Sequence, residues 1–318
     1  MSLRAALDRW LFRVPSREAA PIVLAQRRIF VLPTQSGMAF GLALLLLLTG
    51  SINYNLSLGY ALSFLLGSLG LVAILHTFRN LLDLAIAPGR TEAVFAGHTA
   101  RFQLVLSNTR AEPRYGLRAG LKGGDSQTAD IPAGGQTVLS LGLPAPRRGW
   151  LRPGRVTLAS TYPLGLIRAW SYVAPELACL VYPAPESAPP PLPGGPGGQG
   201  GIRQFEAGRE DFAGLRAYRS ADSPRHIAWK ALAGGGPLLT KQFDGEGGNA
   251  LMLRWDELPA GMDTEARLSR LAAWLLEARQ RNIPCGLSLP GFERAPNENE
   301  AHFQDCLKAL ALHGDAQA

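Results

Sequence analysis

Two apolar runs separated by a short turn occupy residues 37–76: GMAFGLALLLLLTGSI (37–52), NYN (53–55) and LSLGYALSFLLGSLGLVAIL (56–75), followed by His76. The second run has 20 residues without a charged side chain, and the first has 16, which the uncharged residues 33–36 can extend. A hydrocarbon core about 30 Å thick is crossed by roughly 20 apolar residues in a helix that rises about 1.5 Å per residue. A buried hairpin in a soluble domain is the alternative, but such helices show a polar face and these runs show none. The sequence therefore predicts a transmembrane hairpin over 37–76.

The charges on either side of the hairpin predict its orientation. Six arginines and two acids precede the first run, Arg79 and Arg90 follow the second, and the turn between the runs is uncharged. Positively charged flanks are held at the cytoplasmic face of a membrane. We therefore expect both termini in the cytoplasm, with the hairpin in the bacterial inner (cytoplasmic) membrane.

A G-x-x-x-G pair, Gly37 and Gly41, lies in the first run. Two small residues one helical turn apart let helices approach closely. The pair predicts close packing inside the hairpin rather than between two copies of the chain.

Residues 1–36 form a basic N-terminal segment that is expected to be cytoplasmic. The chain has a net charge of +7, and this segment holds six arginines against two acids. Membrane topology and contact with the lipid bilayer explain that charge, and no run of basic residues interleaved with aromatic ones follows, so no nucleic acid is expected as a partner. Leu3, Leu7, Trp10 and Leu11 recur at helical spacing, which predicts an amphipathic helix at the membrane surface.

Residues 88–182 change period. Short runs of alternating apolar residues stand at 100–106, 137–143 and 155–159, each bounded by turn sequences rich in Gly, Asn, Asp and Pro. Strands at this spacing, with no helical stretch between them, predict an all-β sandwich.

Residues 183–201 hold 13 Pro or Gly among 19 residues, which predicts an exposed linker. Gly195, Gly197 and Gly200 formally match G-x-G-x-x-G. A dinucleotide site needs a strand before that pattern and a helix after it, whereas a proline-rich stretch precedes it here. No cofactor is predicted.

The most distinctive motif lies in the segment 202–245, where residues 208–230 read GREDFAGLRAYRSADSPRHIAWK and 238–243 read LLTKQF. Acids and cations alternate with aromatic residues, a pattern that suits either a salt-bridged structural clip or a surface that docks a partner. His226, beside Pro224, is expected to cap or pack rather than to act as a base, and no nucleophile elbow is present, so no catalytic residue is predicted. The candidate interface residues are Asp211, Phe212, Leu215, Arg216, Tyr218, Asp222, Arg225, Trp229 and Lys230.

Residues 246–318 predict a small α/β domain. Apolar runs at 249–256 and 284–289 predict buried strands, and apolar faces at 264–280 and 301–312 predict helices, the first capped by Asp263. Strands that alternate with helices imply a parallel sheet.

Three cysteines, Cys179, Cys285 and Cys306, stand singly along the chain. Their number is odd and their spacing matches neither a disulfide framework nor a metal site. We expect reduced thiols in the core.

The motif segment resembles bacterial domain-of-unknown-function family 58. That family shows G-x-D-F-x-x-L-R-x-Y-x-x-G-D-x-x-R-x-I-x-W-K, and the nine candidate interface residues together with Ile227 fall on matching positions. Ala221 stands where the family usually has Gly, and Gly234 stands where it often has Arg. The resemblance covers roughly residues 25–318.

The resemblance implies that the C-terminal part is similar to a von Willebrand factor A domain. In that domain a D-x-S-x-S sequence holds a divalent cation through a carboxylate and two hydroxyls. Here the sequence is Asp256-Glu-Leu-Pro-Ala260, so Leu258 and Ala260 supply no ligand oxygen, and a hard cation needs several. The expectation is a truncated domain without its metal.

Taken together, the fold class predicted is a multidomain membrane protein: a transmembrane helical hairpin, an all-β sandwich and a small α/β domain that is von Willebrand factor A-like. We expect a membrane-anchored cytoplasmic adaptor or scaffold, not an enzyme. The resemblance implies that it works with a MoxR-type AAA+ ATPase in assembly or maturation of envelope or other complexes, beside a transglutaminase-like membrane protein. Two alternatives are a membrane-tethered enzyme that uses Asp211, Asp222 and His226, and a lipid- or envelope-sensing module led by the basic N-terminus.

Overall fold

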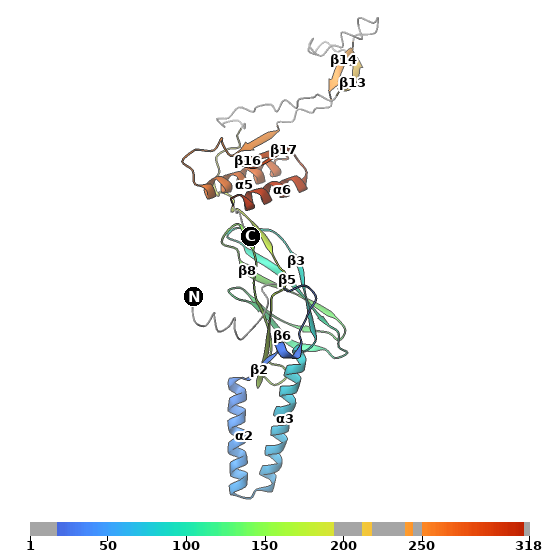
Figure 1. The fold of residues 1–318 in the computed structure, drawn as a ribbon, viewed down its shortest axis with the longest axis vertical. Coiled ribbons are helices and arrows are strands. Elements are labelled where there is room, and N and C mark those ends of the chain that lie inside the picture. Colours follow the sequence, from blue (N-terminus) through green and yellow to red (C-terminus); the bar gives the residue numbers. More distant parts are fainter. Residues whose placement is uncertain (1–17, 194–211, 218–238, 244–249, 315–318) are drawn as a thin grey trace. The chain divides into compact units, whose positions relative to one another are not determined.

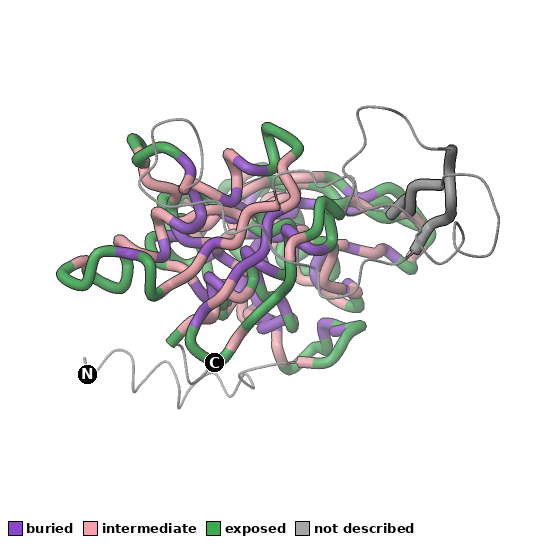
Figure 2. The backbone as a smooth tube through the Cα atoms, turned by 90° about the horizontal axis from the view of Figure 1, so that it is seen from above, coloured by how far each residue is buried: buried purple, intermediate pink, exposed green. Residues whose placement is uncertain are grey.

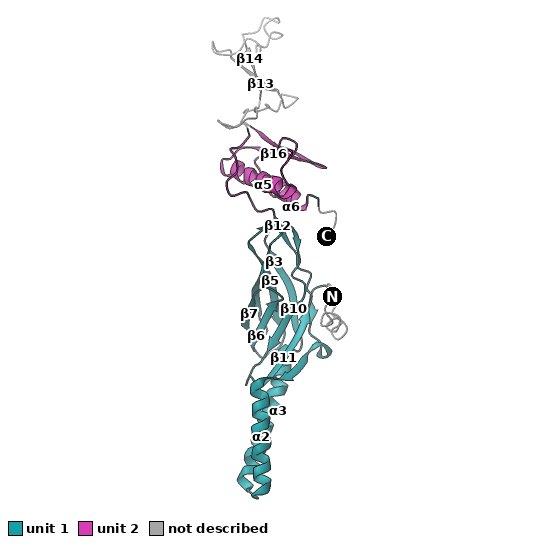
Figure 3. Ribbon diagram, turned by 90° about the vertical axis from the view of Figure 1, so that its left-hand side faces the viewer, with its two compact units in different colours: residues 1–182, 314–318 teal, residues 183–313 magenta. Residues whose placement is uncertain are grey.

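The computed structural model describes residues 18–193, 212–217, 239–243 and 250–314. The chain divides into two compact units, residues 1–182 with 314–318 and residues 183–313 (Figure 3). Each unit is described by itself below.

Two long helices, α2 (Gln35–Asn53) and α3 (Ser57–Leu81), form an antiparallel pair in the first unit (Figure 1). Both are long and apolar enough to cross a membrane, and few of their residues are buried inside the protein. Large apolar side chains such as Leu46, Leu58 and Phe64 are more than 60% exposed. A hydrocarbon environment would remove these side chains from water, as the hairpin prediction requires.

The glycine pair of the first run does not hold the two helices together, so that prediction was wrong. A Cβ on Gly41 would meet nothing within 4 Å, whereas a Cβ on Gly37 would lie 1.9 Å from the carbonyl oxygen of Leu166. The close approach between the helices occurs at a glycine of α3: a Cβ on Gly59 would clash with the side chain of Ser51 in α2, whereas one on Gly67 or Gly70 would make ordinary contact with α2 at 3.7 or 3.4 Å. Gly37 instead lets α2 approach the neighbouring β-domain.

Two antiparallel sheets pack face to face in the same unit as a β-sandwich. Along β5 every second residue, from Ala100 to Leu106, is buried, which is the period of a half-buried strand. Figure 2 colours the buried stretches of the backbone purple. One sheet has the order β1 (Ile22–Val23), β3 (Leu84–Thr91), β5 (Thr99–Asn108), β8 (Gln136–Pro144), and the other β2 (Phe30–Pro33), β11 (Ile167–Val173), β10 (Val156–Ser160), β6 (Arg114–Leu121), β7 (Ser126–Ile131). A small third sheet has the order β4 (Val94–Phe95), β12 (Cys179–Tyr182), β9 (Gly149–Leu151).

In the sequence, the helical hairpin lies between strands of the sandwich rather than before the first of them. Strands β1 and β2 precede the hairpin, and a short 3-10 helix (Gln26–Arg28) connects them. Ile22 pairs with Ile86 of β3, and Leu32 pairs with Arg168 of β11. The structure therefore differs from the predicted boundaries, because the second half of the segment 1–36 belongs to the sandwich that was expected to begin at residue 88. These strands of two and four residues are too short to show a period, so only their distant partners identify them.

The second unit contains β15 (Leu251–Arg254), α5 (Thr264–Gln280), β16 (Cys285–Leu289), β17 (Phe292–Asn297) and α6 (Glu300–Leu312). The parallel pairing of β15 and β16 and the two helices agree with the prediction, including the Asp263 cap, which accepts a hydrogen bond from the Glu265 N–H. Strand β17 was missed: it pairs antiparallel with β16, and its polar, proline-containing sequence shows no strand period. The unit is a small α/β region.

The described half of the proline-rich segment, residues 183–193, forms no helix or strand and is partly exposed, as a linker or long loop should be, but it also lies against α5. Leu192 is only 3% exposed. Glu186 accepts hydrogen bonds of 2.8 and 3.0 Å from Arg270, and the Trp274 indole N–H donates to the Pro190 carbonyl oxygen at 2.8 Å. Proline carries no N–H to satisfy, so an extended proline-rich chain can cover a helix by using its carbonyl oxygens and side chains.

Candidate functional site

The predicted interface residues lie mostly outside the described residues. Phe212, Leu215 and Arg216 belong to β13 (Phe212–Ala217), which pairs antiparallel with β14 (Leu239–Phe243). The two readings of the motif, as a structural clip and as a docking surface, both stay predictions. Those outside the described residues are Asp211, Tyr218, Ala221, Asp222, Arg225, His226, Ile227, Trp229, Lys230 and Gly234, and so are residues 1–17 with the predicted amphipathic helix.

The segment Asp256–Ala260, where the resemblance led us to look for a cation site, is partly buried. Leu258 is 5% exposed and occupies an apolar position, whereas Asp256 is exposed. Across the described ranges, no group of three or more His, Cys, Asp or Glu side chains could hold a metal ion.

The three cysteines are buried and unpaired, as predicted. Burial raises the pKa of Cys285 to about 12 and that of Cys306 to about 11. His302 in α6 approaches both residues, with its Nε2 2.7 Å from the Cys285 carbonyl oxygen and 3.5 Å from the Cys306 sulfur. Such thiols remain protonated at neutral pH and are structural, because a reactive cysteine requires a lowered pKa and access to solvent.

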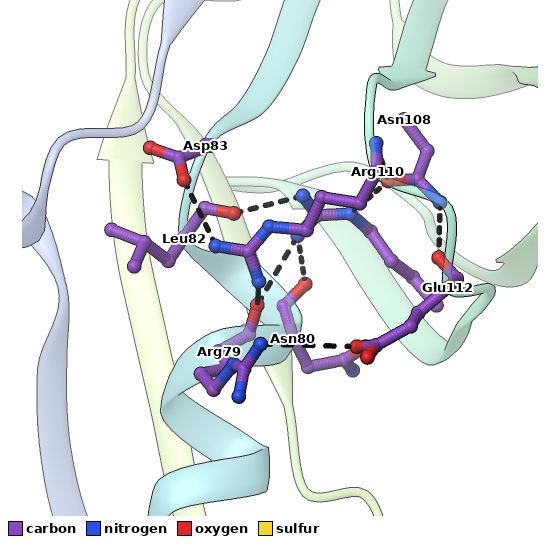
Figure 4. A network of polar contacts seen from close by, with 8 residues as sticks. Arg79, Asn80, Leu82, Asp83, Asn108, Arg110 and Glu112 are labelled. Carbon is purple, nitrogen blue, oxygen red and sulfur yellow. Dashed lines mark hydrogen bonds and ion pairs between the residues drawn. The ribbon is translucent and has the colours of Figure 1, made fainter. Parts of the chain in front are cut away.

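The densest polar network of the described structure lies where α3 enters the sandwich (Figure 4). We call Asn80, Asn108 and Arg114 the α3 clamp. A helix ends with carbonyl groups that have no partner inside the helix, and here side chains of the sandwich supply the missing donors. Arg114, the first residue of β6, donates from Nη1 to the Asn80 carbonyl at 2.6 Å and from Nη2 to the Leu82 carbonyl at 2.8 Å.

Arg114 is 2% exposed, and no carboxylate contacts its guanidinium directly. Its Nε donates to Asn108 Oδ1 at 2.8 Å, and the negative end of the α3 dipole compensates its charge. Burial, followed by the charge of Arg110, lowers the pKa of Arg114 to about 10, while Asp83 acts in the opposite direction. The side chain therefore stays charged at neutral pH and fixes the end of α3 to β6.

Asn80 and Thr77 fasten the same end of α3 to β6, to the end of β10 and to the loop that follows β10. Asn80 Nδ2 donates to the Tyr115 carbonyl and to Ser160 Oγ, both at 2.7 Å. The Thr77 hydroxyl lies 2.7 Å from the Tyr162 carbonyl. These bonds connect α3 with β6 and with the β10–β11 loop, residues 161–166.

Helix α2 is attached to that same loop. Thr34 caps the helix by accepting a hydrogen bond from the Gly37 N–H at 3.1 Å, and its hydroxyl lies 2.6 Å from the Gly165 carbonyl. The Thr34 N–H donates to the Leu166 carbonyl at 2.9 Å. Both helices therefore enter the sandwich through polar contacts on a single loop, an arrangement that transmits the orientation of the hairpin to the β-domain.

A pocket opens beside the α3 clamp, with a volume of about 50 Å³, enough for a few water molecules. Arg110 donates to the Arg79 carbonyl at 2.8 Å and pairs with Asp83 at 2.9 Å. Arg79 approaches Glu112 at 4.0 Å. The lining residues are His76, Arg79, Asn80, Arg110, Glu112, Pro113, Arg114 and Tyr162.

Chemically, the pocket offers cations and hydrogen-bond donors, which suits an anion. Sequence reasoning missed the site because it joins residues 76–80 to residues 110–114 and 162, and nothing in the local sequence distinguishes Arg114 from an exposed arginine. The only sequence feature that sets Arg114 apart is its position directly after a turn, at the start of a strand.

No family model matches the chain, and no curated protein matches it either. The resemblance noted above therefore rests on the motif residues 211–230 and the order of the segments.

Proposed function

We propose that this chain is a membrane-anchored adaptor or scaffold of the bacterial inner membrane, with both termini in the cytoplasm. The observation that carries the proposal is the attachment of two exposed apolar helices to a β-sandwich through the α3 clamp and the β10–β11 loop. A flexible tether would need no buried arginine at the end of a helix. A rigid mount suits a protein that holds its β-domain in a fixed orientation on a membrane.

The partner follows from the resemblance to family 58 and is part of the proposal. A MoxR-type AAA+ ATPase would bind the cytoplasmic portion, and the candidate surface is the motif from Asp211 to Lys230. An assembly or maturation role, beside a transglutaminase-like membrane protein, fits a scaffold without described catalytic geometry. The small α/β unit would then contribute a surface rather than a cation-dependent site.

Two measurements test this proposal. A phosphatase fused after Ala318 should be inactive in the bacterial periplasm, because the arginines on both flanks hold the hairpin ends in the cytoplasm. Activity of that fusion would contradict the orientation.

The second measurement is co-purification of the ATPase with the full chain in mild detergent. Asp222→Ala should abolish co-purification with the fold intact if the motif is a docking surface, and should unfold the protein, at a cost of roughly 3–5 kcal/mol, if Asp222 is half of a buried pair. Asp256→Ala, which changes an exposed acid of the same unit, is the control and should retain the ATPase. Failure of the unmodified chain to retain the ATPase would remove the partner from the proposal.

A further inference from the structure

The pocket beside the α3 clamp lies at the depth where lipid headgroups would lie. The uncharged run of α3 ends at Leu75, and Arg79 follows four residues later, which places it about 6 Å further along the helix axis. A bilayer of about 40–45 Å with a core of about 30 Å has a headgroup layer of roughly 5–7 Å on each side. With α3 across a membrane, Arg79 therefore falls within that layer.

The surface next to the pocket has the composition of a membrane interface. The β10–β11 loop lies between the ends of both helices, through its bonds to Thr34 and Thr77. Tyr162 and Leu164 of this loop are 40% and 47% exposed, and the Tyr162 ring contacts that of Tyr115 with centroids 5.1 Å apart. Tyrosine is enriched at the level of lipid headgroups because its ring is apolar and its hydroxyl is polar.

The charges of the pocket favour an anion. Three guanidinium groups, those of Arg79, Arg110 and Arg114, line it together with the Glu112 carboxylate, and the Asp83 carboxylate pairs with Arg110 at 2.9 Å beside it, which leaves an excess of one positive charge. The Arg79 side chain is 49% exposed and that of Glu112 is 73% exposed, and a pair of this kind 4.0 Å apart in water contributes little. Arg79 can therefore turn to a phosphate without breaking a strong contact, and its planar group suits a phosphate oxygen pair.

We propose that this pocket binds the phosphate of an anionic phospholipid headgroup. Arg79 is its principal ligand, Arg110 and Arg114 contribute positive potential, and Tyr162 contacts the glycerol region at the pocket edge. The proposal rests on the proposed membrane anchoring and adds a lipid partner at a defined site. The site lies on the sandwich and α3, apart from the basic N-terminal segment.

The test measures lipid retention by the full chain in mixed detergent micelles that contain phosphatidylglycerol and phosphatidylcholine, read by native mass spectrometry. Wild type should retain phosphatidylglycerol preferentially. Arg79→Gln should weaken that retention about five-fold, the value expected for one basic residue near an anionic surface. Glu112→Gln should strengthen it, because it removes the lining carboxylate.

The matched control is Arg101→Gln. Arg101 is exposed on β5, seven residues before Asn108 at the α3 clamp, and so lies about 23 Å along the strand from the pocket. Its loss changes the net charge by the same amount and should leave retention unchanged. Thermal unfolding of each variant should match wild type, which separates lost binding from lost folding.

Three results would overturn the proposal. The first is equal phosphatidylglycerol retention by wild type and Arg79→Gln, and the second is an equal loss in Arg101→Gln. The third is displacement of the lipid by millimolar inorganic phosphate, because the site would then take soluble phosphate. Extraction of the chain from membranes by alkaline carbonate would instead contradict the anchoring itself, whereas an integral chain without lipid preference would contradict this proposal alone.

Discussion

Replacing Arg114 with Met should detach α3 from the sandwich. The substitution keeps an unbranched side chain of similar length but removes the donors for the Asn80 carbonyl, the Leu82 carbonyl and Asn108 Oδ1, which Arg114 holds at 2.6, 2.8 and 2.8 Å. Each of these acceptors loses a charged donor, and such a hydrogen bond contributes about 1.5 kcal/mol or more. The three together should lower the free energy of unfolding of the first unit by roughly 4–5 kcal/mol.

A loss of that size should be visible in detergent solution as a lower melting temperature. For a unit of about 150–250 residues, 1 kcal/mol corresponds to roughly 2–4 °C, so the expected shift is about 8–20 °C. Trp170 lies in β11 of the sandwich and reports its unfolding by fluorescence. Arg114→Lys should give an intermediate shift, because one ammonium cannot reach three divergent acceptors.

Arg101→Met is the control for this measurement, since it removes an exposed arginine from strand β5, which lies in the other sheet of the same sandwich. Its melting temperature should stay within about 2 °C of wild type, as is usual for a surface change. An Arg114→Met protein that melts as wild type does would refute the reasoning, because the buried guanidinium would then contribute no net stability.

Three further predictions concern other parts of the chain. Gly37→Ala should destabilise the first unit by about 1–3 kcal/mol, because its Cβ would lie 1.9 Å from a backbone oxygen. Gly41→Ala has open space around it and should be neutral or stabilising, and thermal melts of the two variants check both expectations. The second unit should lose stability as the pH rises above about 8.5, by up to about 1.4 kcal/mol per pH unit for each thiol, because Cys285 and Cys306 keep their protons when folded and lose them when unfolded. Urea unfolding at pH 8 and pH 10 measures that loss, and a Cys285→Ala, Cys306→Ala protein with the same pH dependence would contradict it. Millimolar Mg²⁺ should leave the melting temperature unchanged, and a rise of several degrees would indicate a bound cation.

Periodic elements could be predicted from the sequence because their signal is local. The apolar runs of α2 and α3, the alternation along β5 and β8, and the capped helix α5 all appear at or near their predicted bounds. In each of these elements apolar residues recur with the period of a helix or a strand. That period can be read from the sequence without knowing which element packs against it.

The remaining elements depend on partners far away in the chain. Strand β1 has only two residues. It is a strand because it pairs with β3, which lies on the far side of the hairpin in the sequence. The proline-rich residues 183–193 were expected to form an exposed linker or long loop, but Leu192 is buried and Glu186 accepts hydrogen bonds from Arg270 of α5. The α3 clamp was missed for the same reason, since a buried arginine is recognised by its acceptors and those are backbone carbonyls, which every sequence contains.

The insertion of the hairpin between β2 and β3 has a consequence for biosynthesis. The ribosome releases β1 and β2 before either helix, but their partners β3 and β11 emerge only after both helices. With both helices across a membrane, the sandwich could therefore close only when the two ends of the hairpin reached the same side of the bilayer. A chain that inserted one helix alone would leave β2 across the membrane from β11, with an open sheet edge that quality-control proteases and chaperones recognise. With the hairpin in a membrane, completion of the β-domain would therefore require that both helices insert.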